Sequence, residues 1–433
     1  MTVSRKKNPS KIEIWVGRFM ALTFFSILVY VCFYFSQIVY YRLFYPIEFV
    51  DLRETPATEP PNPEDDVWPF LNHLCNRIEM PGINDVREWT QNDMETLVEK
   101  HAQVLADFRH WRDTGSVDFG LEPYQGMGLQ MRVLDTEPDF YWRLVFKQDK
   151  HRFFKLARLF TVQGVLEIRS NRRAMGLTWI SDSFAICRYF LQNPNYFCLT
   201  NGSFVFRTNL NFLLEFLPAQ TWYPLASQWF PTEQTWRASL AQGMWSNNID
   251  KFRFVDDYFS LRHFMKPKVS DNLRFQYSQA DTLRLFSKHY EGQRKASMAG
   301  PMIYPDFDPE NDKLSRKINK SALRMIANLK RVEKLYFFDV PMAITTSHAI
   351  RARGTLLSSG TPISGTAISQ QLRSEGFTNP FTNRPYEVSA NGALIVPAEY
   401  TIQKPFTYES EGKVQSRYQT YFDHGLVAPE GSK

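Results

Sequence analysis

Serine and histidine are the first residue types to test for catalytic chemistry. Ser358, Ser359 and Ser364 lie in the Gly-, Ser- and Thr-rich segment 354–369, and His348 lies shortly before it. A serine nucleophile on a sharp turn needs the Gly-x-Ser-x-Gly pattern, because that turn exposes the hydroxyl to a histidine base. None of the three serines has this pattern. We therefore expect 354–369 to be a loop, and we assign no catalytic residue.

Metal and cofactor sites need ligands at workable spacing. The segment from Asp306 to Asp312 is acidic, yet a calcium loop beginning at Asp306 would need glycine at position six and glutamate at position twelve, which is Lys317. No Walker motif or dinucleotide fingerprint occurs. The histidines form no His-x-x-x-His pair; they are His73, His101, His110, His151, His263, His289, His348 and His424. We expect no metal and no cofactor, and we interpret the acidic segment as the cap of a basic helix.

Three tryptophans, Trp222, Trp229 and Trp236, recur at intervals of seven. If exposed, their rings would stack on sugars and suit a glycan-binding surface. Loops pinned into a core by the same rings are the alternative, which we favour because Pro224 and Pro231 interrupt any continuous helical face.

An uncharged run of 23 residues, 19–41, is the clearest feature of the chain. At 1.5 Å per residue it reaches about 35 Å, enough for a hydrocarbon core of about 30 Å. The run is too long for the apolar region of a cleaved signal, and no small-x-small cleavage site follows it. We predict a retained transmembrane helix over 19–41 that contacts the lipid bilayer.

Charge around this run predicts its orientation. Residues 1–18 form a tail with five basic residues and one acidic residue, whereas 42–61 hold two arginines and four acidic residues. The positive-inside rule then places 1–18 in the cytoplasm and the bulk of the chain outside it. Much of the net charge of +6 therefore lies in the tail, and we expect no nucleic-acid partner.

The predicted compartment bears on the oxidation state of the few cysteines. Cys187 and Cys198 lie 11 residues apart, and in an oxidising compartment they are a candidate disulfide pair that would leave Cys75 free. Buried free thiols are the alternative.

Helical periodicity dominates the region beyond the span. Asn92-x-x-Glu95 indicates a capping box before an apolar stripe that includes His101, which we interpret as a packed histidine. Residues 149–169 and 174–191 predict an αα-hairpin in which Gly164 and Gly176 allow close backbone approach.

The strongest helical pattern covers 313–336, and its polar face is basic. A solvated helix face is the plain interpretation. The alternative is contact with an anionic lipid, glycan or acidic protein through Lys313, Arg316, Lys317, Lys320 and Arg324.

The tail has β character. Asn391-Gly392 between apolar runs predicts a two-residue type I′ turn, and we expect 379–398 to form an antiparallel hairpin packed on helix 313–336. The fold class is therefore mainly α, and α+β overall. The predicted units are a cytoplasmic tail (1–18), the transmembrane helix (19–41), a proline-rich acidic spacer (42–67), a helical extracytoplasmic domain with αα-hairpins (68–300), and a basic helix with a C-terminal hairpin module (301–433).

One tail segment carries a resemblance. Asn379-Pro-Phe-Thr-Asn-Arg-Pro385-Tyr386 resembles the Asp-Pro-Phe-x-x-x-Pro turn that ends pseudopilin domains and also a broad group of uncharacterised bacterial single-span envelope proteins. Further short likenesses to that group are Asp66-Val-Trp68-Pro-Phe-Leu, the hairpin 149–191 and Leu329 to Tyr336. Asn379 replaces the aspartate, and no prepilin-peptidase site follows Gly17, so the chain is not a pilin.

The resemblance implies an inner-membrane, single-pass protein with a periplasmic body, but it carries no activity. We expect a non-enzymatic scaffold or accessory subunit of an envelope assembly, with other envelope proteins as partners. The alternative is a membrane-anchored hydrolase acting on envelope glycan or peptide.

Overall fold

A computed structural model covers the 433-residue chain. It describes residues 11–43, 68–81, 86–114, 152–192, 196–259, 279–305, 320–398, 407–410, 413–416 and 418–431. The protein is mainly helical, with small β elements near its C-terminus, as the sequence predicts.

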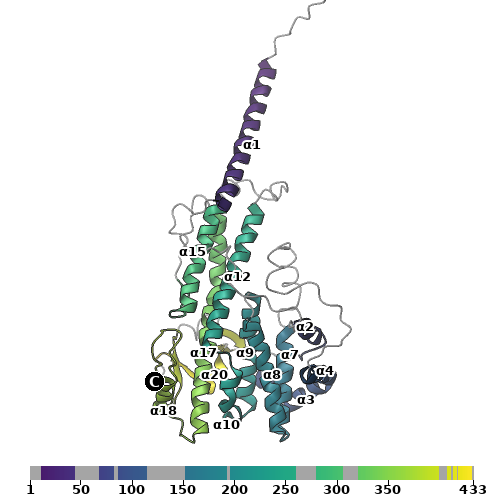
Figure 1. The fold of residues 1–433 in the computed structure, drawn as a ribbon, viewed down its shortest axis with the longest axis vertical. Helices are drawn as coiled ribbons and strands as arrows, with labels where there is room; N and C mark the ends of the chain where they lie inside the picture. The colour runs from purple at the N-terminus through teal and green to yellow at the C-terminus, as the bar shows by residue number, and fades with distance from the viewer. Residues whose placement is uncertain are drawn as a thin grey trace, which may run out of the picture.

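Helix α1 (Lys11–Leu43) projects from one end of the helical body (Figure 1). Its window Ile14–Phe33 is long and apolar enough to cross a membrane, and none of that window is buried inside the protein. Thr23 and Ser26 donate their hydroxyls to backbone carbonyls one turn earlier, so these polar side chains make intrahelical hydrogen bonds. The spacer 42–67 lies outside the described residues apart from the last turn of α1.

The first elements of the body are α2 (Trp68–Asn76), the 3-10 helix η2 (Val86–Glu88), α3 (Gln91–Lys100) and α4 (Ala102–Thr114). The capping box occurs, but at Thr90 and Asp93, two residues before the predicted one. The helix divides at His101, whose Nε2 lies 3.0 Å from the carbonyl oxygen of Glu79. His101 is buried, as expected of a packed histidine.

The predicted αα-hairpin is confirmed as α7 (Arg152–Arg169) and α8 (Arg173–Gln192). Asn171 takes a positive φ of 62° in the turn between them. A Cβ atom on Gly176 would lie 2.5 Å from the Gly164 carbonyl oxygen, so the two helices approach at a distance that only glycine permits.

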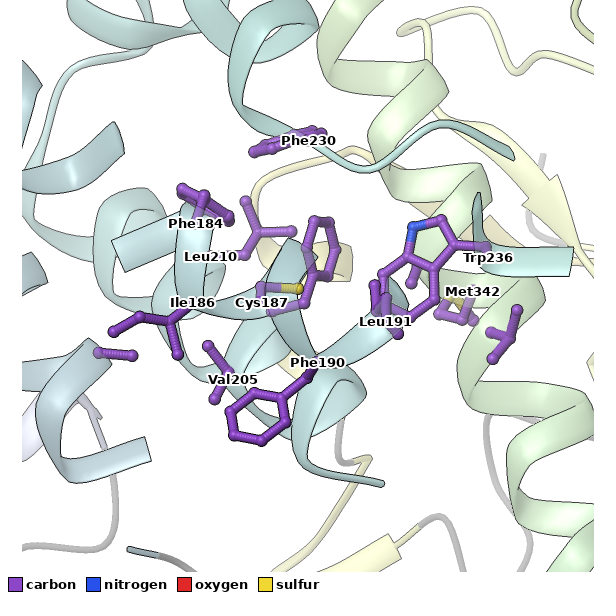
Figure 2. Packing of buried hydrophobic residues seen from close by; sticks show 14 of the residues in the cluster. Phe184, Ile186, Cys187, Phe190, Leu191, Val205, Leu210, Phe230, Trp236 and Met342 are labelled. Carbon is purple, nitrogen blue, oxygen red and sulfur yellow. The ribbon is translucent and has the colours of Figure 1, made fainter. Parts of the chain in front are cut away.

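Helix α9 (Tyr196–Phe216) packs against this hairpin and leads into the short helices α10 (Ala219–Trp222), η3 (Tyr223–Leu225) and α11 (Ala226–Trp229), followed by α12 (Glu233–Phe259). Trp222, Trp229 and Trp236 are all buried, so they are core residues and not an exposed sugar-stacking surface. Figure 2 shows Trp236 near Leu191 and Met342, with Phe230, Phe184 and Cys187 nearby.

Helix α15 (Gln279–Met298) packs on α12, and α17 (Lys320–Ser358) runs beside both (Figure 1). The helix predicted to end at 336 continues through Pro341 to Ser358. Pro341 cannot donate the usual helical hydrogen bond, yet the surrounding residues 337–350 are all buried, and packing holds the helix together.

The segment predicted as a loop, 354–369, is therefore largely helical. It comprises the last turn of α17 and the start of α18 (Gly365–Ser374), whose N-cap is Ser364. Gly354 lies within α17 and packs against the backbone of Tyr223, where a Cβ atom would clash at 2.3 Å. The glycine is therefore explained by this close packing and not by a helix end.

The tail turn differs from the predicted type I′ turn. Ser389 N–H donates to the Ala393 carbonyl, and Gly392 N–H donates to Ser389, which closes a three-residue loop. Of the predicted pair, only Gly392 has positive φ (84°). This is a type I turn with a bulge at glycine, because Asn391 uses its side chain to accept from Ser389 Oγ and does not need a left-handed backbone.

The strands form two small sheets. β1 (Leu394–Val396) pairs in parallel with β4 (Val427–Pro429), and β2 (Thr407–Ser410) pairs antiparallel with β3 (Lys413–Ser416). Of the predicted hairpin, the structure has one isolated antiparallel bridge, between Val388 and Leu394. The short helix α20 (Gln419–Asp423) precedes β4.

The tail packs on α17 beyond the predicted range 313–336. The Phe381 ring lies 5.6 Å from the Phe338 ring, Tyr386 Oη lies 2.9 Å from His348 Nδ1, and Arg353 donates to the Gly392 carbonyl. The prediction chose the right helix, but these contacts lie beyond its expected end at 336, because α17 continues to Ser358. One continuous hydrophobic core, from Phe70 to Val427, joins the helical body and the tail.

Candidate functional site

The described residues hold a buried polar cluster between α12, α15 and α17. Glu333 of α17 is at its centre and is 0% exposed. Asn247 and Asn248 reach it from α12, and His289 and Gln293 reach it from α15. Residues 289 and 293 are one helical turn apart, so both side chains lie on the same face of α15.

Both oxygens of the Glu333 carboxylate accept hydrogen bonds. Oε1 accepts from Asn247 Nδ2 at 2.8 Å and from Asn248 Nδ2 at 3.4 Å. Oε2 accepts from Gln293 Nε2 at 2.6 Å and lies 2.9 Å from His289 Nε2. A buried carboxylate with this many donors is satisfied, so the cluster binds three helices to one another.

Tyr304 completes the cluster from the segment that follows α15. Its hydroxyl donates to Glu333 Oε2 at 3.0 Å and lies 3.1 Å from His289 Nε2. Burial, followed by the nearby Glu333 carboxylate, raises the pKa of Tyr304 well above its usual value, so the hydroxyl keeps its proton and remains a donor.

A second polar group lies where the tail meets α17. His348 Nδ1 lies 2.9 Å from Tyr386 Oη, its Nε2 lies 3.7 Å from Glu233 Oε2, and the Phe377 ring stacks on the imidazole at 3.9 Å. Arg237 donates to Glu233 and to the carbonyls of Ser297 and Gly300. The group therefore joins the start of α12 to α17, the end of α15 and the tail.

Burial lowers the pKa of His348 to about 3, and the positive charges of Arg351 and Arg237 act in the same direction. The Glu233 carboxylate would raise it, but at 3.7 Å and partly exposed it does not offset the loss of hydration. His348 is neutral at pH 7 and acts as a hydrogen-bonding core residue.

The serines considered as nucleophiles do not meet this histidine. Ser358 Oγ donates to the Gly354 carbonyl, Ser359 Oγ donates to the Leu356 carbonyl, and Ser364 Oγ caps α18. Each hydroxyl makes its hydrogen bond at the helix end in which it lies.

Arg158 of α7 is a third unusual polar residue. It is only 8% exposed, and its guanidinium lies over the rings of Phe212 at 4.8 Å and Trp89 at 5.8 Å. Among the described residues no carboxylate or carbonyl accepts a hydrogen bond from it, and its buried Nε has no acceptor. Burial lowers its pKa to about 10, so it remains charged at pH 7.

The energetics of Arg158 are unfavourable as they stand. Burying an ion costs several kcal/mol even after relaxation. Two cation–π contacts return about 0.5–2 kcal/mol each. The rings therefore offset only part of the loss of hydration, and a buried positive charge is left without an anion among the described residues.

The two cysteines of the candidate disulfide are buried free thiols in the structure. Cys187 donates to the Gly202 carbonyl of α9, and burial raises the pKa of its thiol above the usual range. Figure 2 shows Cys187 among buried hydrophobic side chains, and the structure has no bond between the sulfur atoms of the two cysteines.

The basic surface predicted from the sequence lies largely outside the described part of the chain. Lys313, Arg316 and Lys317 are not described, nor is the acidic segment 306–312. Lys320 and Arg324 are in α17, but their side chains are not among the described ones. Anionic contact at this surface stays a prediction.

Among the described residues, no group of three or more His, Cys, Asp or Glu side chains could hold a metal ion. Comparisons with protein-family models, with curated proteins and with solved structures found no match.

Sequence reasoning missed the Glu333 cluster. Glu333 lies among basic residues, which favours an exposed helix face, and Asn247 and Asn248 belong to no motif. The available signal was the pair His289 and Gln293, polar residues four apart in a helix, but such pairs are equally common on exposed faces. Only packing places them opposite Glu333.

Proposed function

We propose that the protein is a membrane-anchored scaffold or accessory subunit of a bacterial envelope assembly. The observation that carries this proposal is α1, an exposed apolar helix whose end lies against α15 of the helical body (Figure 1). The proposed anchor, α1, thus contacts α15, which itself packs against α12 and α17.

The polar cluster supports the same role. His289 and Gln293 of α15 bind Glu333 of α17, and Asn247 of α12 binds the same carboxylate. Breaking the hydrogen bonds of a buried carboxylate is costly, because it leaves an uncompensated charge. These bonds therefore hold the three helices in fixed positions relative to one another. A rigid helical body attached to a single anchor is suited to holding partner proteins at a membrane surface.

The proposed orientation places the N-terminus in the cytoplasm and the body in the periplasm, with the inner membrane as the site of anchoring. The basic residues Arg5, Lys6 and Lys7 precede the span, while acidic residues predominate after it. This asymmetry is the positive-inside pattern.

Reporter fusions test the orientation. Alkaline phosphatase fused after Lys433 is expected to be active, and β-galactosidase at the same position inactive. The matched control replaces Arg5, Lys6 and Lys7 with glutamate, which should reduce the fraction of correctly oriented chains. An active cytoplasmic reporter after Lys433 in the natural sequence would refute the periplasmic placement.

Partner capture tests the scaffold role. Full-length protein, cross-linked in intact cells and solubilised in mild detergent, is expected to bring down one or more envelope proteins in fixed ratio. A variant in which a generic transmembrane helix replaces 19–41 separates partners of the anchor from partners of the body. Recovery of the chain alone, with no partner in fixed ratio, would rule out a scaffold.

A further inference from the structure

Among the described residues Arg158 is a buried cation without an anion, and we propose that it is the anchoring group of a binding site for an oxyanion, the carboxylate or phosphate of a ligand. Arg158 is in α7, and the rings that it contacts are Phe212 of α9 and Trp89, which directly follows η2. This inference is independent of the scaffold role and of the orientation of the chain.

The other arginines that are buried or nearly so show what Arg158 lacks. Arg353 donates to the carbonyls of Gly392 and Gly425, and Arg351 donates to those of Phe230 and Pro231. Each of these guanidinium groups has oxygen acceptors provided by the fold. Among the described residues Arg158 has none, although it is as deeply buried as Arg353. The Nε atom is buried without an acceptor in all three arginines, so the difference lies in their terminal N–H groups.

The contacts that Arg158 does make leave its donors available. Aromatic rings interact with the face of a guanidinium, whereas its N–H groups point outward in the plane. With Phe212 at 4.8 Å and Trp89 at 5.8 Å, the in-plane edge is the part without a partner. That edge matches a carboxylate or phosphate, which accepts two parallel N–H bonds.

Trp89 is buried but has exposed neighbours along the chain. Trp89 follows directly after η2, in which Val86 is buried while Arg87 and Glu88 are exposed. Arg87 lies 3.9 Å from Asp423 of α20, a long and partly exposed ion pair. Such a partly exposed pair contributes little to stability.

The test uses the full-length protein in detergent micelles and follows its thermal unfolding. Inorganic phosphate and acetate are titrated separately against sodium chloride at matched ionic strength, and the two arms separate a phosphate site from a carboxylate site. A ligand present at a hundred times its Kd is expected to raise the Tm by about 4 °C or more, saturably.

The variant Arg158→Met removes the cation and keeps most of the volume. It is expected to abolish the response to the probe and to raise the Tm measured without oxyanion, because an uncompensated buried charge has been removed. The matched control is Arg169→Met, on the same helix, where an exposed arginine lies over Phe216 and donates to its carbonyl. This control should respond to the probe as the natural protein does.

Three results would overturn the proposal. One is a natural protein whose Tm responds to neither probe. Another is an equal response in the natural protein and in Arg158→Met. The third is a lower Tm of Arg158→Met without any probe, which would assign the anion to a carboxylate of this chain outside the described residues. If Arg158→Met does not fold, Arg158→Lys keeps the charge, loses the planar fork and is expected to bind the probe at least tenfold more weakly.

Discussion

At the scale of single residues, Glu333 is the side chain whose loss should matter most. Glu333→Gln keeps the size but puts an amide N–H₂ where one carboxylate oxygen accepts from its neighbours, so donors would face donors. We expect a loss of about 3 kcal/mol in the free energy of unfolding, measured by denaturant titration.

The matched control is Glu95→Gln, because Glu95 is exposed and accepts a single bond from Gln91. Its unfolding midpoint should stay unchanged. Equal midpoints for Glu333→Gln and the natural protein would mean that the cluster does not link the helices as described.

His348 predicts a dependence of stability on pH. Its pKa is about 3 in the fold against an ordinary value of 6.5, so between these pH values the unfolded chain binds a proton that the folded chain does not. Its contribution is complete above pH 6.5 and is lost, at about 1.4 kcal/mol per pH unit, as the pH falls toward 3. Glu233, Arg237 and Arg351 are the charged groups that face it.

Denaturant unfolding at pH 7 and pH 5 measures this effect. The natural protein should lose about 2 kcal/mol more than His348→Gln over that interval, because glutamine does not titrate. The difference between the two proteins cancels the contribution of other acidic and basic groups. Parallel pH profiles would show that His348 is protonated within the fold.

At the scale of elements, the α7–α8 hairpin depends on its two glycines. Gly176→Ala gains at most about 1 kcal/mol of helix propensity. Its new Cβ atom would lie 2.5 Å from the Gly164 carbonyl and 3.0 Å from Ile168 N, both backbone atoms that cannot rotate away. Overpacking of this kind costs about 1–3 kcal/mol, so we expect a net loss of stability in thermal unfolding.

Gly300→Ala is the control for the hairpin, since the nearest atom to its Cβ position, Lys295 O, is 3.9 Å away. Its Tm should stay within about 2 °C of the natural protein. A Gly176→Ala variant that is more stable than the natural protein would show that the helices lie further apart than described.

At the scale of the whole molecule, the candidate span of α1 lies outside the hydrophobic core. The hydrophobic core draws its residues from Phe70 onward, and the candidate span in α1 buries nothing within the protein. A chain lacking residues 1–66 should therefore leave the membrane fraction, stay soluble and unfold cooperatively near the Tm of the full-length protein. Circular dichroism and sedimentation measure this, and an aggregated or uncooperative product would mean that α1 is part of the fold.

The sequence by itself determined the features that depend on neighbours along the chain. The apolar run of 19–41 predicts a membrane span, and the helices on either side of Asn171 follow from their period and their turn. The two glycines of the hairpin, Gly164 and Gly176, also predicted the close approach of its helices. These features are local, because the hydrogen bonds and hydrophobic faces involved lie within one or two helices.

Tertiary structure decided the features that join distant segments. The parallel pairing of Leu394 with Val427, the extension of α17 through Pro341, and the meeting of His289 with Glu333 all depend on packing between elements. Local signals for the last two pointed elsewhere, since proline disfavours a helix and a glutamate among lysines suggests an exposed face. Arg158 is the clearest case, because its burial between two rings comes from three separate segments and no local pattern announces it.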